Sequence, residues 1–302
     1  MGTNRLIHLT RQVPASPVKV LLNIGWFCFP KKTRAAVLAL YSWCQSCKDR
    51  MDQVQSPADA HRVWDELQQL TRSAQNTKTQ MADPNFEGLR LVLQTTQLPL
   101  EFPLSFLRGL LTEAQFPAPR NQAELLEYCS QTAGAIGLMV CHLIGVQDRA
   151  ALEHAVELSQ GLRLTQISRD IEKDLRQNRV FVPLDWLESN GLSPQNLHEG
   201  WARYLWPRLS HQLLTLAEQK LESGRQIFHF LSFRGSWAVN VTLGLWRHLG
   251  RKILDQGARA WDKPCAFSYF EVALVILIES ALTMLLHLPR LLTRRRRQMR
   301  LG

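Results

Sequence analysis

The chain has 302 residues, of which 45% are hydrophobic and 21% charged, and its formal net charge is +10 at pH 7. This hydrophobic content excludes a mainly disordered chain, which would lack the apolar residues needed for a core. The positive charge indicates an anionic partner. Six arginines lie within residues 290–302, however, so the remainder of the chain is only mildly basic. We therefore expect no nucleic-acid partner.

Helical periodicity runs through almost the whole chain, beginning after Pro30. Val37, Leu40, Tyr41 and Cys44 follow the i, i+3, i+4, i+7 spacing of one helical face. Period-two alternation is scarce, and the best turn signal is "ESNGLS". The sequence therefore predicts an all-α fold. The helices are predicted, in chain order, at residues 31–53, 57–75, 85–97, 103–114, 121–144, 150–177, 207–230, 236–260 and 268–287.

No linker, repeat or low-complexity block divides the chain, so a single helical domain is expected at residues 21–289. A basic N-terminal extension (1–20) precedes it and an Arg-rich tail (290–302) follows. Residues 1–48 contain seven Lys or Arg and no acid, a bias also seen in organelle presequences. Because this segment continues directly into an apolar helix, we expect no targeting function and a cytoplasmic protein.

Six cysteines are scattered along the chain, and Cys44 and Cys47 form an isolated C-x-x-C. A second pair with zinc-type spacing is absent from the sequence, as is a His pair that could replace it. We therefore expect buried thiols on a helix rather than a metal or redox site.

Small residues gather in "YCSQTAGAIGLMV", within the predicted helix at 121–144. A glycine inside a helix costs about 1 kcal/mol relative to alanine. Two compensations are open: close packing of a neighbouring helix, or a cavity wall that accommodates an apolar ligand. The small residues are Ala133, Gly134, Ala135 and Gly137.

Two aspartates lie four residues apart in "LTQISRDIEKDLRQNRVFVP" and so share one helical face. On a surface helix, Asp170 and Asp174 would form weak ion pairs with their basic neighbours. Facing a bundle interior, they would instead hold Mg²⁺, which binds carboxylates together with phosphate oxygens. Arg179 would then add positive charge near a diphosphate. Both interpretations remain open from the spacing alone.

Four segments resemble the squalene/phytoene synthase family, in the right order between about residues 25 and 290. "LTQISRDIEKDLRQNRVFVP" resembles its second aspartate-rich motif, including D-x-x-x-D and the R-V-x-x-P tail. "EYCSQTAGAIGLM" is similar to its Y-C-x-x-x-A-G-x-x-G segment, which places Tyr128 and Gly134 in matching positions. "FPKKTRAAVLALYSWC" resembles the first-motif helix, and "LWRHLGRKILD" a late helix.

The resemblance implies an isoprenoid-synthase type bundle with a central cavity. Active family members condense two prenyl diphosphates head to head, with Mg²⁺ as cofactor, in carotenoid or squalene/hopanoid biosynthesis. The residues that the resemblance implies as metal ligands are Asp170, Asp174, Asp52 and Asp49. Those it implies as catalytic are Asp170, Asp174, Asp52 and Tyr128. Substrate contacts are expected from Arg169, Arg179, Lys48, Gln166 and Gly134.

The chain departs from the family pattern where the chemistry would take place. Lys48 matches the first Asp of the first motif, and Gln45 replaces an Arg; Arg163 and Gln166 replace a Gln and an Asn. An ammonium at position 48 repels Mg²⁺ but attracts a diphosphate. Upstream, Leu21, Leu22 and Asn23 replace a Ser-Phe-Tyr element. Two functions therefore stay open: a prenyltransferase, or a non-catalytic family member acting as a lipid-binding or complex-assembly factor at a membrane.

The last predicted helix, in "YFEVALVILIESALTMLLHLPRLLTRRRRQMR", is apolar but carries Glu271 and Glu279, and no uncharged apolar run reaches 18 residues. It therefore suits a core helix or one lying in a membrane interface. A solvated tail remains the alternative for the arginine run. We expect peripheral attachment to an anionic membrane surface. The residues expected to make this contact are Arg294, Arg295, Arg296 and Arg297.

Overall fold

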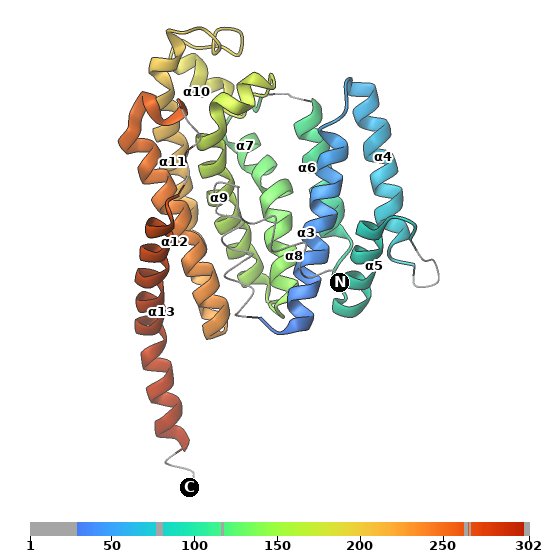
Figure 1. Cartoon of the computed structure of the whole chain (residues 1–302), viewed down its shortest axis with the longest axis vertical. Coiled ribbons are helices and arrows are strands. Elements are labelled where there is room, and N and C mark those ends of the chain that lie inside the picture. Colours follow the sequence, from blue (N-terminus) through green and yellow to red (C-terminus); the bar gives the residue numbers. More distant parts are fainter. Residues whose placement is uncertain (1–28, 77–80, 116–117, 263–264, 266, 299–302) are drawn as a thin grey trace.

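The computed structural model describes residues 29–76, 81–115, 118–262, 265 and 267–298, with side chains as far as residue 286. Within this part of the chain all regular elements are helices, which confirms the all-α prediction (Figure 1). The expected extension at 1–20 lies outside the described residues, as do the side chains of the tail. The α-helices are α3 (Lys31–Met51), α4 (Pro57–Ser73), α5 (Pro84–Thr96), α6 (Glu101–Gln115), α7 (Gln122–Cys129), α8 (Ala135–Leu143), α9 (Arg149–Arg176), α10 (Leu184–Ser189), α11 (Trp206–Gly224), α12 (Phe233–Gln256) and α13 (Tyr269–Gln298).

Local capping groups fix several helix starts. Ser56 precedes α4, and its side chain accepts a hydrogen bond from the backbone N–H of Asp59. Asp148 caps α9 in the same way, through the N–H of Ala151. Such caps satisfy backbone donors that have no partner inside the helix. They explain why these helices start within one residue of the predicted positions.

Other boundaries differ from the prediction for visible reasons. The helix predicted at 121–144 is interrupted by a π-helical turn, η1 (Ser130–Gly134), between α7 and α8. The segments predicted at 207–230 and 236–260 end in 3₁₀ turns, η3 (Arg225–His229) and η4 (Gly257–Trp261). A further 3₁₀ turn, η2 (Ala202–Leu205), precedes α11. The predicted turn is confirmed after α10, where Gly191 has φ +70°.

Two large apolar clusters flank the middle of the bundle. One joins α3, α4, α5, α6 and α8, with Trp43, Phe86 and Leu107 fully buried. The other joins α7, α9, α11 and α12. In Figure 1, α9 runs between α11 and α12 on one side and α3, α6 and α8 on the other. Side chains that face across this boundary are therefore placed at the centre of the molecule.

Close helix packing accounts for the small residues after Tyr128. A Cβ on Gly137 would lie 2.2 Å from the Ser159 hydroxyl of α9. A Cβ on Gly109 of α6 would lie 3.0 Å from the backbone of η1. Gly134 is buried, and a Cβ there would make ordinary contacts, the nearest to Val156 at 3.4 Å. The packing explanation is thus confirmed for Gly137.

Cys44 and Cys47 are buried free thiols, as predicted. Burial raises the pKa of both thiols well above the usual range, which keeps them protonated and unreactive.

Candidate active site

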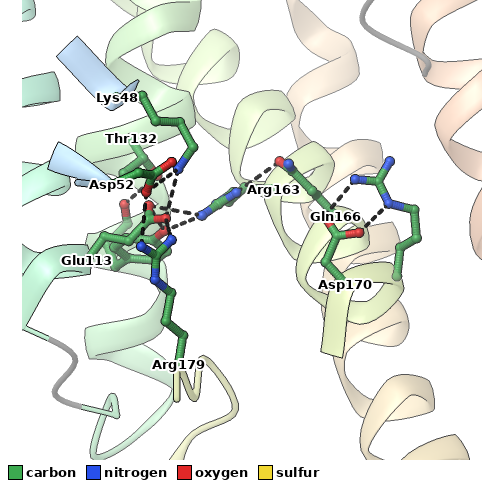
Figure 2. Close-up of polar contacts among 10 residues, drawn as sticks. Lys48, Asp52, Glu113, Thr132, Arg163, Gln166, Asp170 and Arg179 are labelled. Carbon is green, nitrogen blue, oxygen red and sulfur yellow. Dashed lines mark hydrogen bonds and ion pairs between the residues drawn. The ribbon is translucent and has the colours of Figure 1, made fainter. Parts of the chain in front are cut away.

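A single buried carboxylate, Glu113 of α6, lies at the centre of the polar groups between the two apolar clusters (Figure 2). Its oxygens accept hydrogen bonds from Lys48 Nζ at 2.9 Å, Arg179 Nη1 at 3.0 Å and the Tyr128 hydroxyl at 2.8 Å. Arg163 Nη2 lies 3.4 Å from Glu113 Oε2. Four segments of the chain, α3, α7, α9 and the loop after α9, thus meet on one side chain of α6. We call these five residues the Glu113 cluster.

Charge balance explains why a carboxylate is stable at this depth. Burial alone would raise the pKa of Glu113, but the charges of Arg163 and Lys48 lower it to about 2. The side chain is therefore ionised at neutral pH and its cations are held in fixed positions. Burial raises the pKa of Tyr128 well above its usual range, so its hydroxyl stays protonated and donates to Glu113.

Arg163 of α9 lies between Glu113 and Asp170 (Figure 2). Its guanidinium lies over the rings of Tyr128 and Phe181, 5.2 and 5.6 Å from their centroids. It donates to the Tyr128 hydroxyl and, at 3.0 Å, to Gln166 Oε1. Its Nε is buried and has no hydrogen-bond partner among the described residues. Arg163 therefore carries a buried positive charge, and its Nε–H donor has no partner among the described residues.

The two aspartates of the first aspartate-rich segment lie in different surroundings. Asp52, which follows α3, accepts a hydrogen bond from Arg179 Nη2 at 2.9 Å and lies 3.8 Å from Lys48 Nζ. Asp49 is exposed and accepts from Gln45 at 2.7 Å, away from the cluster. The structure thus brings Asp52 to the Glu113 cluster and leaves Asp49 outside it.

The second segment keeps both aspartates on the partly buried face of α9. Arg169 binds Asp170 through two hydrogen bonds of 2.6 Å and lies over the Trp246 ring of α12, 5.9 Å from its centroid. Burial, and next the charge of Asp170, raise the pKa of Asp174 to about 7. Two oxygen donors that repel one another in this way are suited to a hard divalent cation.

The two halves of the site therefore differ in how well they fit a metal. Asp170 and Asp174, which we call the aspartate pair, match the donor chemistry of Mg²⁺. Among the described residues, Asp170 pairs with Arg169, whereas Asp52 pairs with both Arg179 and Lys48, so the α3 half fits an anion better than a metal. Across the parts of the chain that are described, no cluster of three or more His, Cys, Asp or Glu side chains is arranged to hold a metal ion.

A cavity of about 240 Å³ opens beside Glu113, Tyr128 and Arg179. Tyr128 and Phe181 stack on one another in its wall, with ring centroids 5.1 Å apart. This volume lies slightly below the roughly 300–1,000 Å³ usual for ligand pockets. Gly134 does not line this cavity. The other lining residues are Thr112, Ala118, Pro119, Glu124, Glu127, Gln131 and Val180.

Two residues of this site were not predicted from the sequence, namely Glu113 and Phe181. A signal for Glu113 was present, because it follows Phe106 and Leu110 at helical spacing and so lies on the buried stripe of α6. A carboxylate on such a stripe needs cationic partners. Phe181 lies in the loop after α9, where periodicity carries no signal.

A family model described as squalene/phytoene synthase matches residues 24–271. A 15-cis-phytoene synthase of Enterobacter agglomerans is 30% identical over 243 residues, which cover 78% of this chain and 82% of that protein. The same name belongs to a Pantoea ananas protein that is 31% identical over 244 residues, covering 78% of each chain.

Solved structures share the fold. A dehydrosqualene synthase in complex with a ligand superposes with a TM-score of 0.72 at 20% identity, covering 86% of this chain and 90% of that one. A squalene synthase from Alicyclobacillus acidocaldarius gives a TM-score of 0.69 at 20% identity, covering 78% and 88%. The fold is therefore the all-α isoprenoid-synthase bundle.

Proposed function

Because this chain belongs to the squalene/phytoene synthase family, we propose that it binds prenyl diphosphates and condenses two of them head to head in isoprenoid biosynthesis. The relatives named phytoene synthase support the reaction class. One observation carries the proposal. Figure 2 shows Arg163 between Asp170 of the aspartate pair and the cations Lys48 and Arg179, and Arg179 lines a cavity with an apolar wall.

The aspartate pair supplies the metal half of the proposed site. Asp170 and Asp174 would hold Mg²⁺, which when bound neutralises charge on the departing diphosphate. Asp174 must lose its proton first, and Arg169 holds the Asp170 carboxylate in place through two hydrogen bonds. These two residues therefore prepare oxygen donors on one face of α9.

The Glu113 cluster supplies the anion half. Lys48 and Arg179 each have one ion pair with Glu113 and one with Asp52, which fixes where their positive charges lie. Lys48 is 38% exposed, so its remaining donors can reach a diphosphate. Preorganised cations of this kind stabilise charge that develops on a leaving group. In this half, protein cations take the part that a metal ion would play.

The cavity wall supplies the apolar surroundings. Ala118, Pro119, Val180 and Phe181 present carbon surface next to the charged groups. Such a wall keeps water from a carbocation once the diphosphate has left. Tyr128 keeps its proton and holds Glu113 in place by a hydrogen bond, so it acts as a positioning residue in this proposal.

A second candidate function is a non-catalytic family member that binds a lipid or assists assembly at a membrane. The observation that favours it is the complete pairing of Glu113 and Asp52 with protein cations, beside a cavity of only about 240 Å³. In that case the ion pairs would be structural, and no diphosphate would be released.

Turnover separates the two candidates. Purified protein is given farnesyl or geranylgeranyl diphosphate with and without MgCl₂, and released inorganic diphosphate is measured. The proposal predicts Mg²⁺-dependent release that Asp170→Asn/Asp174→Asn abolishes. The matched control is Glu172→Gln on the same helix, whose carboxylate pairs with Arg176 at 2.7 Å and should leave release unchanged. Absence of release from folded protein with both substrates would favour the second candidate.

A further inference from the structure

Helix α13 is joined to the rest of the protein by a row of polar side chains and by Val272, Val275 and Ile276, which pack on the core. It packs against α12, and hydrogen bonds connect the two helices along three successive levels. In a helix on the surface of a water-soluble protein, the apolar stripe faces the core and the polar face meets water. In α13 a row of polar side chains faces the protein, and most of the large apolar side chains face solvent. The hydrogen-bonded pairs are Trp237–Ser280, Asn240–Thr283 and Lys252–Glu271, at 2.7, 2.8 and 2.9 Å.

Glu279 also lies in the contact between α13 and α12. A Cβ on Gly244 of α12 would lie 2.6 Å from the Glu279 side chain, so this carboxylic side chain packs directly on the α12 backbone. Burial raises the pKa of Glu279, although the charges of Arg247, Arg225 and Arg251 oppose this. Among the described side chains of α13, Thr283 and Val275 are buried, and Val272 and Ile276 are partly buried against the core.

The opposite face of α13 is a row of large apolar side chains in contact with solvent. Phe270 is 76% exposed, Leu277 68% and Leu285 65%. The eighteen residues Tyr269–Leu286 are long and apolar enough to cross a membrane, yet only 11% of them are buried. A soluble core helix would meet the same criterion only by being mostly buried, so that explanation does not apply. An exposed apolar surface of this extent marks an interaction site.

We propose that this apolar face of α13 docks on the surface of a lipid bilayer that contains anionic lipids. Charge supports a membrane as the occupant. Residues 294–297 are four consecutive arginines at the C-terminal end of the same helix. Each Lys or Arg near an anionic lipid surface strengthens binding by charge attraction. A parallel pairing of two copies through α13 would instead bring two such arginine runs together.

The helix lies on the membrane rather than crossing it. Its polar face stays attached to α12, where Glu271 binds Lys252 at 2.9 Å and His248 at 3.1 Å. A spanning position would carry these charged groups into the hydrocarbon, which is costly. An interfacial position buries the apolar face and leaves the polar face on the protein. Figure 1 shows α13 along the outer edge of the bundle, where no other labelled helix covers it.

Vesicle flotation tests the proposal with the full chain. Two vesicle types are used, phosphatidylcholine alone and phosphatidylcholine with phosphatidylglycerol. The protein is expected to float with both, and more strongly with the anionic mixture. Leu277→Glu should lower the partition coefficient about tenfold or more, because it removes a leucine that the bilayer would bury and adds a charge. The matched control is Leu91→Glu on α5, where the leucine is also exposed (49%), and it should bind as the wild type does.

A second variant separates the apolar and ionic contributions. Replacing all four arginines at 294–297 with glutamine should remove the preference for anionic vesicles while retaining binding to neutral ones. Since Leu277 is largely exposed, circular dichroism should show unchanged helix content in Leu277→Glu.

Three results would overturn the proposal. They are no flotation with either vesicle type, equal flotation of Leu277→Glu and wild type, and a soluble dimer in sedimentation velocity that Leu277→Glu dissociates. The last result would assign the face to a second copy of the chain. None of these measurements involves turnover, so they are independent of the proposed reaction.

Discussion

Glu113 is the residue on which three cations of the site depend. In Glu113→Gln, the neutral amide leaves Lys48, Arg163 and Arg179 without their shared anion. Breaking a buried ion pair by removing one partner costs about 3–5 kcal/mol. Urea-induced unfolding should show a loss of this order. Glu153→Gln is the control, since Glu153 is exposed and pairs only within α9, with Arg149. Equal losses for the two variants would contradict the central role of Glu113.

Asp174 should make the stability of the metal-free protein depend on pH. Its pKa is raised from 3.8 to about 7 in the folded protein, by burial first and by Asp170 next. The folded state thus holds this proton more tightly than the unfolded chain does. The resulting stabilisation is complete below pH 3.8 and is lost as the pH rises through about 7.

Metal binding at the aspartate pair should have the opposite pH dependence, because Mg²⁺ requires the ionised carboxylate. Thermal melts across this pH range, with and without MgCl₂, should therefore show a larger Mg²⁺-induced rise in Tm above pH 7 than below pH 6. The pH at which this rise develops should match the pKa of Asp174 to within about one unit. Asp174→Asn should remove both this rise and the pH dependence of the metal-free protein. A rise in Tm that is the same at all pH values would count against a metal at this pair.

Individual residues were predicted unevenly. The positions of Lys48, Asp52 and Arg179 near one another follow from the family pattern, and the structure brings them together. The same pattern also implied Asp49, which the structure places on the outer side of α3. Only three-dimensional packing shows that Glu113 balances these charges, because α6 is distant from α3 and α9 in the sequence.

Among the helices, α6 and η1 are in close contact at Gly109. A Cβ there would lie 2.6 Å from the Thr132 side chain and 3.0 Å from the backbone of η1. Gly109→Ala should therefore push α6, which carries Glu113, away from η1. Overpacking of this kind typically costs about 1–3 kcal/mol.

The matched variant is Gly134→Ala in η1 itself. Its Cβ would make contacts no shorter than 3.4 Å, and alanine favours helix, so stability should stay the same or rise slightly. Tm values from calorimetry check both variants. A Gly109→Ala protein as stable as the wild type would show that α6 and η1 can separate without loss.

Helices were predicted correctly where the segment with helical apolar spacing is long and a capping residue precedes it. All nine predicted helices exist, and the start of α9 lies within one residue of its prediction because Asp148 caps it. The short α10 was missed because six residues contain too few helical turns for periodicity. The π turn η1 was missed because five residues are too few for their spacing to distinguish a π turn from an α-helix.

For the molecule as a whole, the sequence predicted the fold class and the family, and the comparisons confirm both. The relation between the two halves of the site was beyond prediction. It depends on how two apolar clusters pack on either side of Arg163. The orientation of α13 was also open, because its apolar pattern suits a core helix and an interfacial helix equally well.

The central claim is that protein cations around Glu113 bind diphosphate directly, while the aspartate pair binds it through metal. Titration calorimetry with farnesyl thiodiphosphate, which resists ionisation, tests this in EDTA and in MgCl₂. We predict binding in EDTA that Lys48→Asp weakens about tenfold or more, since a charged hydrogen bond is lost. Lys220→Asp on α11 is the control for the change of charge and should bind as the wild type does. MgCl₂ should strengthen binding unless both aspartates of the pair are replaced by asparagine. No binding in EDTA, or equal binding by Lys48→Asp and wild type, would contradict the claim.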